Sequence, residues 1–143
     1  MLLRVACRRE RTWAPRALLC CLTIAACAST YSGQGVESLA PEQIGILEHD
    51  DPVNGGIVIE EVDGHWRGVG MMTRYRLTPG PHSLGVKVNL AFYSSDRVVR
   101  WLAVKPGKVY SIQAATDAGA LRWGFWIVDK ATGERVDSET RPP

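Results

Sequence analysis

Residues 82–92 read H-S-L-G-V-K-V-N-L-A-F, and this stretch decides the fold class. Apolar side chains stand at every second position from Leu84 to Phe92 and alternate with small or polar ones. Successive side chains of a β-strand point to opposite faces of the sheet, so the pattern places one face against a core and the other towards water. The stretch therefore predicts a strand in a sheet that is covered on one side.

The segments on either side are also short and apolar, and turns rich in glycine and proline separate them. In K-P-G-K, residues 105–108, the proline presets φ and the glycine supplies a positive φ. Closely spaced turns of this kind leave no room for crossover helices and are typical of antiparallel sandwiches and barrels. We predict an all-β fold, a small antiparallel β-sandwich of about seven strands over residues 44–143, with strands at 44–49, 56–62, 72–77, 82–92, 98–104, 108–115 and 121–128.

Charge and cysteine are distributed unevenly along the 143 residues. Five of the 17 basic and one of the 15 acidic side chains lie in residues 1–26, so the rest of the chain has 12 and 14 and a net charge of −2. All four cysteines lie at or before Cys27. A basic nucleic-acid surface, a disulfide framework, a cysteine nucleophile and a zinc site built on cysteine pairs are therefore not expected in the folded part.

The N-terminus has the layout of an export signal. A positively charged region over 1–16 precedes an apolar run over 17–26, which is too short to span a membrane as a helix. The run ends in I-A-A-C, which resembles the lipobox of bacterial lipoproteins. The resemblance implies recognition of Ile24, Ala25 and Ala26 by a signal peptidase, cleavage before residue 27 and acylation of Cys27. The alternatives are an ordinary secretory signal and an uncleaved anchor.

The lipobox resemblance also implies a location. Several acyl chains on one cysteine hold a protein stably in a membrane. In this family an aspartate after the cysteine retains the protein in the inner membrane, and the residue here is Ala28. We therefore expect an outer-membrane lipoprotein that faces the periplasm. We divide the chain into a signal peptide (1–26), the lipidated cysteine with a flexible tether (27–43) and the β-sandwich domain (44–143).

The domain itself resembles a known family. L-T-P-G-P-H-S-L-G-V (77–86), V-K-P-G-K-V-Y-S-I (104–112) and the segment from Trp123 to Val136 are similar to small proteobacterial lipoproteins of unknown function with a PEGA-like β-sandwich. The resemblance implies a sandwich fold and a place in the cell envelope. It transfers no catalytic residue to this chain.

Candidate catalytic groups are few. His49 and His65 have aspartates nearby but lack a recognisable metal-ligand spacing, and His82 is expected to cap a turn or lie at a strand edge. Glu60 and Glu61 are adjacent in a strand and should point to opposite faces, so they are not expected to act as a carboxylate pair. We predict no catalytic residue, metal or cofactor, and a cryptic metal-dependent hydrolase around His49 or His65 is our third hypothesis.

Tryptophans are the better candidates for binding. Trp123 and Trp126 are an odd number of residues apart in a predicted strand, so they should lie on opposite faces, and Trp101 precedes the apolar Leu102 in another strand. An exposed tryptophan can stack on a sugar ring or anchor a protein partner. The favoured function is a lipid-anchored envelope protein with a non-catalytic binding or structural domain. Its partners would be the membrane, through the acyl groups, and an envelope protein or peptidoglycan. The alternative function is a peptidoglycan-binding module that uses Trp101, Trp123 or Trp126.

Overall fold

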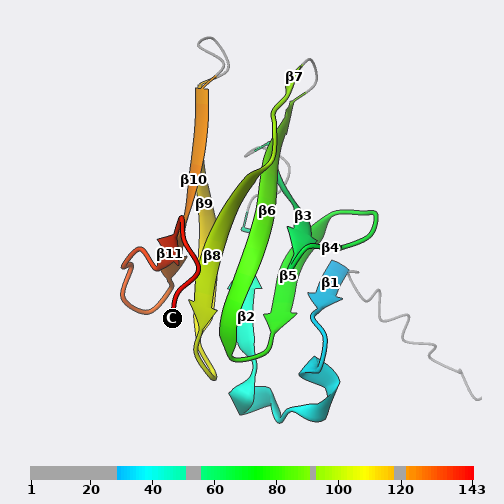
Figure 1. Ribbon diagram of the computed structural model, residues 1–143, viewed down its shortest axis with the longest axis vertical. Coiled ribbons are helices and arrows are strands. Elements are labelled where there is room, and N and C mark those ends of the chain that lie inside the picture. The colour runs from blue at the N-terminus through cyan, green and yellow to red at the C-terminus, as the bar shows by residue number, and fades with distance from the viewer. Residues whose placement is uncertain (1–28, 51–55, 91–92, 118–121) are drawn as a thin grey trace, which may run out of the picture.

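The computed structural model describes residues 29–50, 56–90, 93–117 and 122–143. Two packed sheets form a β-sandwich (Figure 1). The elements are β1 (Ser29–Ser32), the 3-10 turns η1 (Val36–Ser38) and η2 (Pro41–Gln43), β2 (Gly45–Glu48), β3 (Ile57–Val62), β4 (His65–Trp66), β5 (Met72–Leu77), β6 (Gly80–Leu90), β7 (Tyr93–Ser94), β8 (Val98–Val104), β9 (Val109–Asp117), β10 (Arg122–Asp129) and β11 (Asp137–Ser138).

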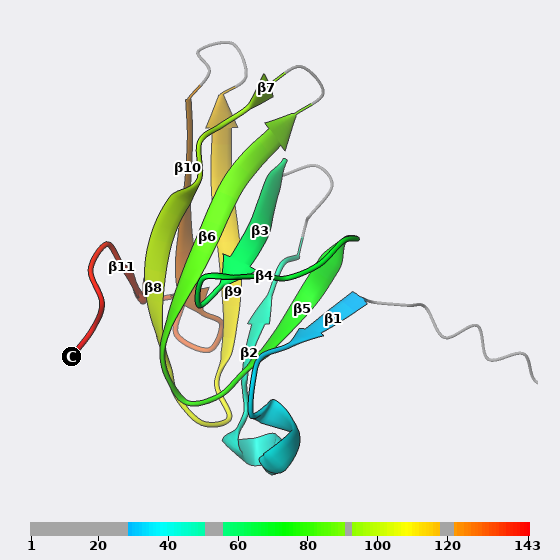
Figure 2. The same cartoon turned by 45° about the vertical axis from the view of Figure 1, so that its right-hand side comes forward.

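The predicted all-β sandwich is confirmed, and a strand is found at each of the seven predicted positions. One sheet has the order β1-β5-β2-β9-β10, and the other has the order β11-β8-β6-β3-β4 with β7 paired to β6. Most neighbouring strands are antiparallel, as predicted. The pairs β1–β5 and β2–β9 are parallel, and in each pair strands of the other sheet separate the two partners along the chain (Figure 2).

The core lies between the two sheets and confirms the alternation that defined β6. Leu84, Val86 and Val88 are buried, whereas Lys87 is half-buried and Asn89 is exposed. Each sheet contributes its inward positions to a single apolar cluster. The cluster consists of Leu47, Ile57, Ile59, Val62, Tyr75, Leu77, Leu84, Val86, Val88, Leu102, Val104, Tyr110, Ile112, Phe125 and Ile127.

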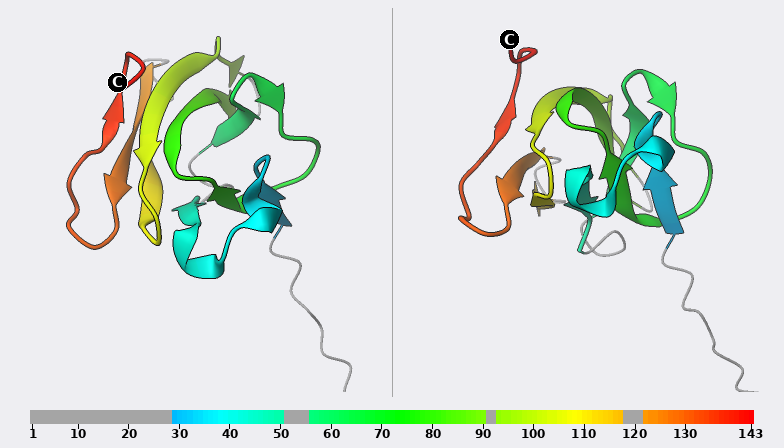
Figure 3. Two further views of the ribbon diagram at one scale, coloured as in Figure 1. Left: turned by 60° about the horizontal axis from the view of Figure 1, so that its bottom comes forward. Right: turned by 90° about the horizontal axis from the view of Figure 1, so that it is seen from below.

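The flexible tether predicted up to residue 43 is wrong for residues 29–43. Tyr31 of β1 packs against the core cluster, and Val36 of η1 has no exposed surface. The turns η1 and η2 lie at one end of the sandwich, between β1 and β2 (Figure 3). The polar composition of this segment suggested a linker, but β1 pairs with the edge of β5, and Val36 and Tyr31 pack inwards although most of the segment is exposed.

The predicted opposition of Glu60 and Glu61 is also wrong. The register between β3 and β6 shifts between Ile59 and Glu61, so β3 contains a bulge. A bulge inserts one extra residue and lets two successive side chains leave the core side. Both carboxylates are half-buried, and each forms an ion pair, Glu60 with Lys87 and Glu61 with Arg97.

Candidate functional site

The chain enters the sandwich at the edge of β5. Ser29 pairs with Met72, and the ring of Tyr31 lies 5.7 Å from that of Tyr75. The amide of Gly33 donates to the carbonyl of Arg76 at 2.9 Å and extends the pairing. The proposed processing residues Ile24, Ala25 and Ala26 and the proposed lipidation site Cys27 lie outside the described residues.

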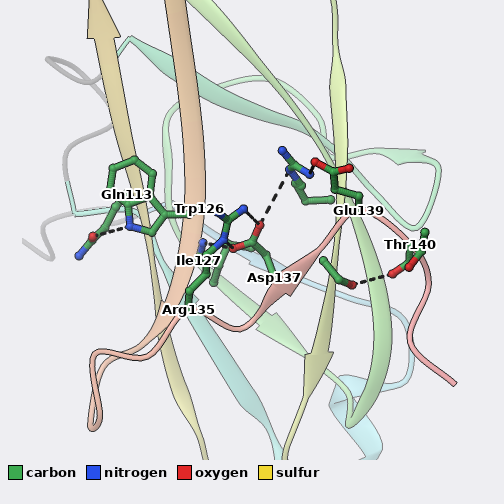
Figure 4. Close-up of polar contacts among 9 residues, drawn as sticks. Gln113, Trp126, Ile127, Arg135, Asp137, Glu139 and Thr140 are labelled. Carbon is green, nitrogen blue, oxygen red and sulfur yellow. Dashed lines mark hydrogen bonds and ion pairs between the residues drawn. The ribbon is translucent and has the colours of Figure 1, made fainter.

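The three candidate tryptophans do not form one surface. Trp123 packs against the core and stacks on Phe125 at 6.0 Å, whereas Trp126 lies outside the core cluster and its Nε1 donates to Oε1 of Gln113 at 2.9 Å (Figure 4). Trp101 belongs to the other sheet, and the Arg141 guanidinium lies 5.5 Å from the centre of its ring. Each ring therefore has a partner within the chain, and the structure does not bring the three together.

A polar pocket of about 290 Å³ lies beside β1. Its lining includes a contact between the β3–β4 turn and the start of β6, where Oδ2 of Asp63 lies 2.6 Å from Nδ1 of His82. The other carboxylate oxygen of Asp63 accepts from the amide of Ser83 at 2.9 Å. Burial and the negative charge of Asp63 raise the pKa of the Tyr31 hydroxyl. The lining residues are Tyr31, Gln34, Val62, Asp63, His65, Thr78 and His82.

Asp63, His82 and Thr78 have the order of a catalytic triad but not its hydrogen bonding. Nε2 of His82 lies 3.3 Å from the Thr78 hydroxyl and only 2.7 Å from the Thr78 carbonyl oxygen. The nearer partner of this nitrogen is thus the backbone carbonyl and not the hydroxyl that a triad histidine would activate. His82 instead ties the T-P-G-P turn to Asp63, in agreement with its predicted turn-capping role.

The other two histidines are not brought together. His49 is buried beside β5, where its amide donates to the carbonyl of Thr73, and His65 is exposed at the opposite sheet's edge strand β4. Within the described ranges, no three His, Cys, Asp or Glu side chains come close enough to hold a metal ion. The described part of the chain therefore offers no set of metal ligands for the third hypothesis, a metal-dependent hydrolase around His49 or His65.

A buried carboxylate joins the two sheets at the edge opposite β1. The side chain of Asp137 in β11 has no exposed surface, and Oδ1 accepts from the amide of Ile127 in β10 at 2.8 Å (Figure 4). Both oxygens also accept from the Arg135 guanidinium, at 2.8 and 2.9 Å. Arg100 of β8 lies 3.9 Å away on the other side and binds Glu139. This cluster therefore connects β8 of one sheet to β10 of the other at this edge of the sandwich.

This cluster predicts a loss of stability in acid. Burial raises the pKa of the Asp137 carboxyl, but hydrogen bonds from Arg135 and from the Ile127 amide outweigh it and hold that pKa below its ordinary value. The hydrogen bond from Arg100 likewise lowers the pKa of the Glu139 carboxyl. A carboxyl whose pKa is lower in the folded state stabilises the protein above its unfolded pKa, and the stabilisation is lost as the pH falls through the folded value.

We therefore expect urea midpoints that stay level from pH 7 to about pH 5 and fall below about pH 4, where the unfolded carboxyls begin to bind protons. Asp137→Asn should flatten the acid side of this profile, because one of the responsible carboxyls is absent. A midpoint that rises on acidification below pH 4 would contradict the assignment.

Sequence reasoning did not find two features that the structure places near β1. The Asp63–His82 contact joins residues 19 apart in the chain, and no local pattern predicts it. The second feature is the β4–β5 connection, where the apolar residues Trp66, Val69 and Met71 are exposed. The sequence W-R-G-V-G-M (66–71) does contain a signal, because it holds three large apolar residues among two glycines and an arginine, outside any predicted strand.

Comparison with models of known protein families, with curated proteins and with solved structures finds no match to this chain. Within residues 29–50, 56–90, 93–117 and 122–143, no helix has the length and apolar character needed to cross a membrane.

Proposed function

We propose that this protein is a lipid-anchored envelope protein whose β-sandwich acts without catalysis, as a binding or structural module at the periplasmic face of the outer membrane. The observation that carries the proposal is the apolar run over 17–26, which ends in I-A-A-C in a chain with no later cysteine. Ala28, in place of aspartate, favours the outer over the inner membrane. The PEGA-like resemblance supports an envelope role.

The folded domain begins close to the proposed lipidation site, so the connection between lipid and domain is short. Only Ala28 separates Cys27 from the first residue of β1. Two residue steps span at most about 7 Å, so an acyl group on Cys27 would hold the folded domain directly at the lipid surface. This arrangement differs from a long tether, because it limits how far the sandwich can move from the membrane.

The hydrogen bonding of the polar pocket supports a role without catalysis. Asp63 uses both carboxylate oxygens and His82 uses both ring nitrogens to fasten two turns together. In a triad the outer histidine nitrogen would face the hydroxyl that it activates, whereas Nε2 of His82 lies closer to the Thr78 carbonyl oxygen. The groups that come nearest to a triad in the described part of the chain are thus used for structure.

The decisive test is Cys27→Ser. We expect the variant to accumulate as an uncleaved precursor without acyl mass, since the thiol is the acceptor of the lipid. Intact-mass spectrometry of the protein from a diderm bacterial host measures both properties, and detergent-phase partitioning measures the anchor.

Cys21→Ser is the matched control, because it makes the same chemical change six residues earlier in the same apolar run. It should leave a mature chain that begins at Cys27 and carries acyl mass. Normal processing of Cys27→Ser, or a native polypeptide that begins before residue 27, would overturn the proposal.

A further inference from the structure

The end of β4 and the connection to β5 carry an exposed apolar surface that the fold does not use. Trp66 is 65%, Val69 81% and Met71 59% exposed. The other exposed large apolar side chains in the described residues, Val98 and Val99, are less exposed, at 37% and 47%. Three such side chains within six residues form a patch of the kind that marks an interaction surface. We call residues 66–71 the apolar loop.

The apolar loop is held in a defined shape by Arg67. The Arg67 side chain turns inwards, where Nε donates to the carbonyl of Ile59 and Nη1 donates to the carbonyl of Gly70 at 2.6 Å. The backbone amide of Arg67 also donates to the carbonyl of Glu60 at 3.0 Å. With the polar residue pointing inwards, the tryptophan, valine and methionine are left at the surface.

The loop lies next to the point where the chain leaves for its N-terminus. Met72, directly after the loop, pairs with Ser29, the first residue of β1. Figures 1 and 2 show β1 and the β4–β5 connection at the same side of the molecule. Because residue 27 lies within about 7 Å of Ser29, an acyl group there and the apolar loop would face the same surface.

We infer that the apolar loop inserts into the headgroup region of the bilayer that holds the acyl chains of Cys27. The inference rests on the proposed lipid anchor. Tryptophan favours this region because its ring is apolar and its N–H stays near water, and valine and methionine add apolar area. The partner is thus a lipid surface, and the second contact would fix the orientation of the sandwich on the membrane.

The short connection favours a lipid surface over a protein. The anchor brings the loop to the bilayer at a high effective concentration, so insertion adds no further cost of bringing two molecules together. A protein bound to the same loop would have to fit between the sandwich and the membrane, within the reach of one intervening residue.

The tryptophans of the processed chain allow a direct test. The native acylated protein is reconstituted into phosphatidylethanolamine–phosphatidylglycerol vesicles that contain lipids brominated along their acyl chains, which quench nearby tryptophans. We expect quenching in the wild type and loss of most of it in Trp66→Phe. Trp126→Phe is the matched control, because it removes another tryptophan of the sandwich and should leave the quenching in place. Circular dichroism checks that both variants remain folded.

Each outcome decides a different point. Equal quenching in the two variants, or none in the wild type, would overturn the insertion of the loop while leaving an acylated Cys27 intact. A wild-type mass without acyl groups would overturn the proposed anchor and this inference with it. If Trp66 is shielded from water-soluble iodide but not quenched by brominated lipid, a contact with a second copy of the chain replaces the membrane contact.

Discussion

Asp137→Ala should lower the free energy of unfolding by about 3 kcal/mol, because it removes a buried charged acceptor from three donors at once. The Ile127 amide would lose its partner at the free edge of β10, and the Arg135 guanidinium would lose both of its hydrogen bonds. Nε of Arg100 is buried and has no hydrogen-bond partner, so it would also lose the Asp137 charge that lies 3.9 Å from it.

Urea unfolding of the purified protein at pH 7, followed by circular dichroism, measures this loss. Asp137→Asn should fall between the wild type and the alanine variant, since an amide oxygen can still accept from Ile127. Glu139→Ala is the matched control, because Glu139 binds the same Arg100 but its side chain is 80% exposed. It should lower the urea midpoint much less than Asp137→Ala does, because solvent screens an exposed ion pair. Equal losses in Asp137→Ala and Glu139→Ala would show that the buried carboxylate does not hold the edge together.

Gly45→Ala is expected to cost about 2 to 3 kcal/mol by overpacking. A Cβ at this position would lie 2.1 Å from Cγ1 of Val104, a separation that real side chains do not reach. Val104 is buried and β-branched, so its side chain has few other rotamers to adopt. The clash would force β2 of one sheet away from the end of β8 in the other.

A second substitution separates this clash from any effect of alanine on the strand. In Gly45→Ala/Val104→Ala the offending methyl group is absent, so the double variant should be more stable than the sum of the two single losses predicts. We expect a coupling of about 1 to 2 kcal/mol from the double-mutant cycle in urea. Additive losses would mean that the two sheets do not approach each other closely at this point.

The strands were predictable because their signals are local. The alternation in 82–92 and the proline–glycine turns depend on residues close together in the chain, and each of the seven predicted segments contains a strand. The short strands β1, β4, β7 and β11 were not predicted. They have two or four residues each, which is too few to show a period, and they form because a longer strand offers them an edge.

The candidate site was less predictable. The odd spacing of Trp123 and Trp126 correctly indicated that only one packs against the core. That Gln113 and Arg141 contact Trp126 and Trp101 follows from pairing with other strands and from the path of the C-terminus, and neither is visible in the neighbouring sequence. The bulge that turns Glu60 and Glu61 away from the core likewise depends on the register with β6.

The sequence by itself determined the fold class, because burial in a sandwich repeats every two residues and turns need particular backbone angles. It also supplied the proposed anchor, because export and acylation are read from a short linear segment. Only the tertiary structure decided that residues 29–43 belong to the domain, that Asp137 closes one edge of the sandwich and that the apolar loop lies beside β1. These features depend on contacts between residues far apart in the chain, and such contacts exist only once the two sheets have packed.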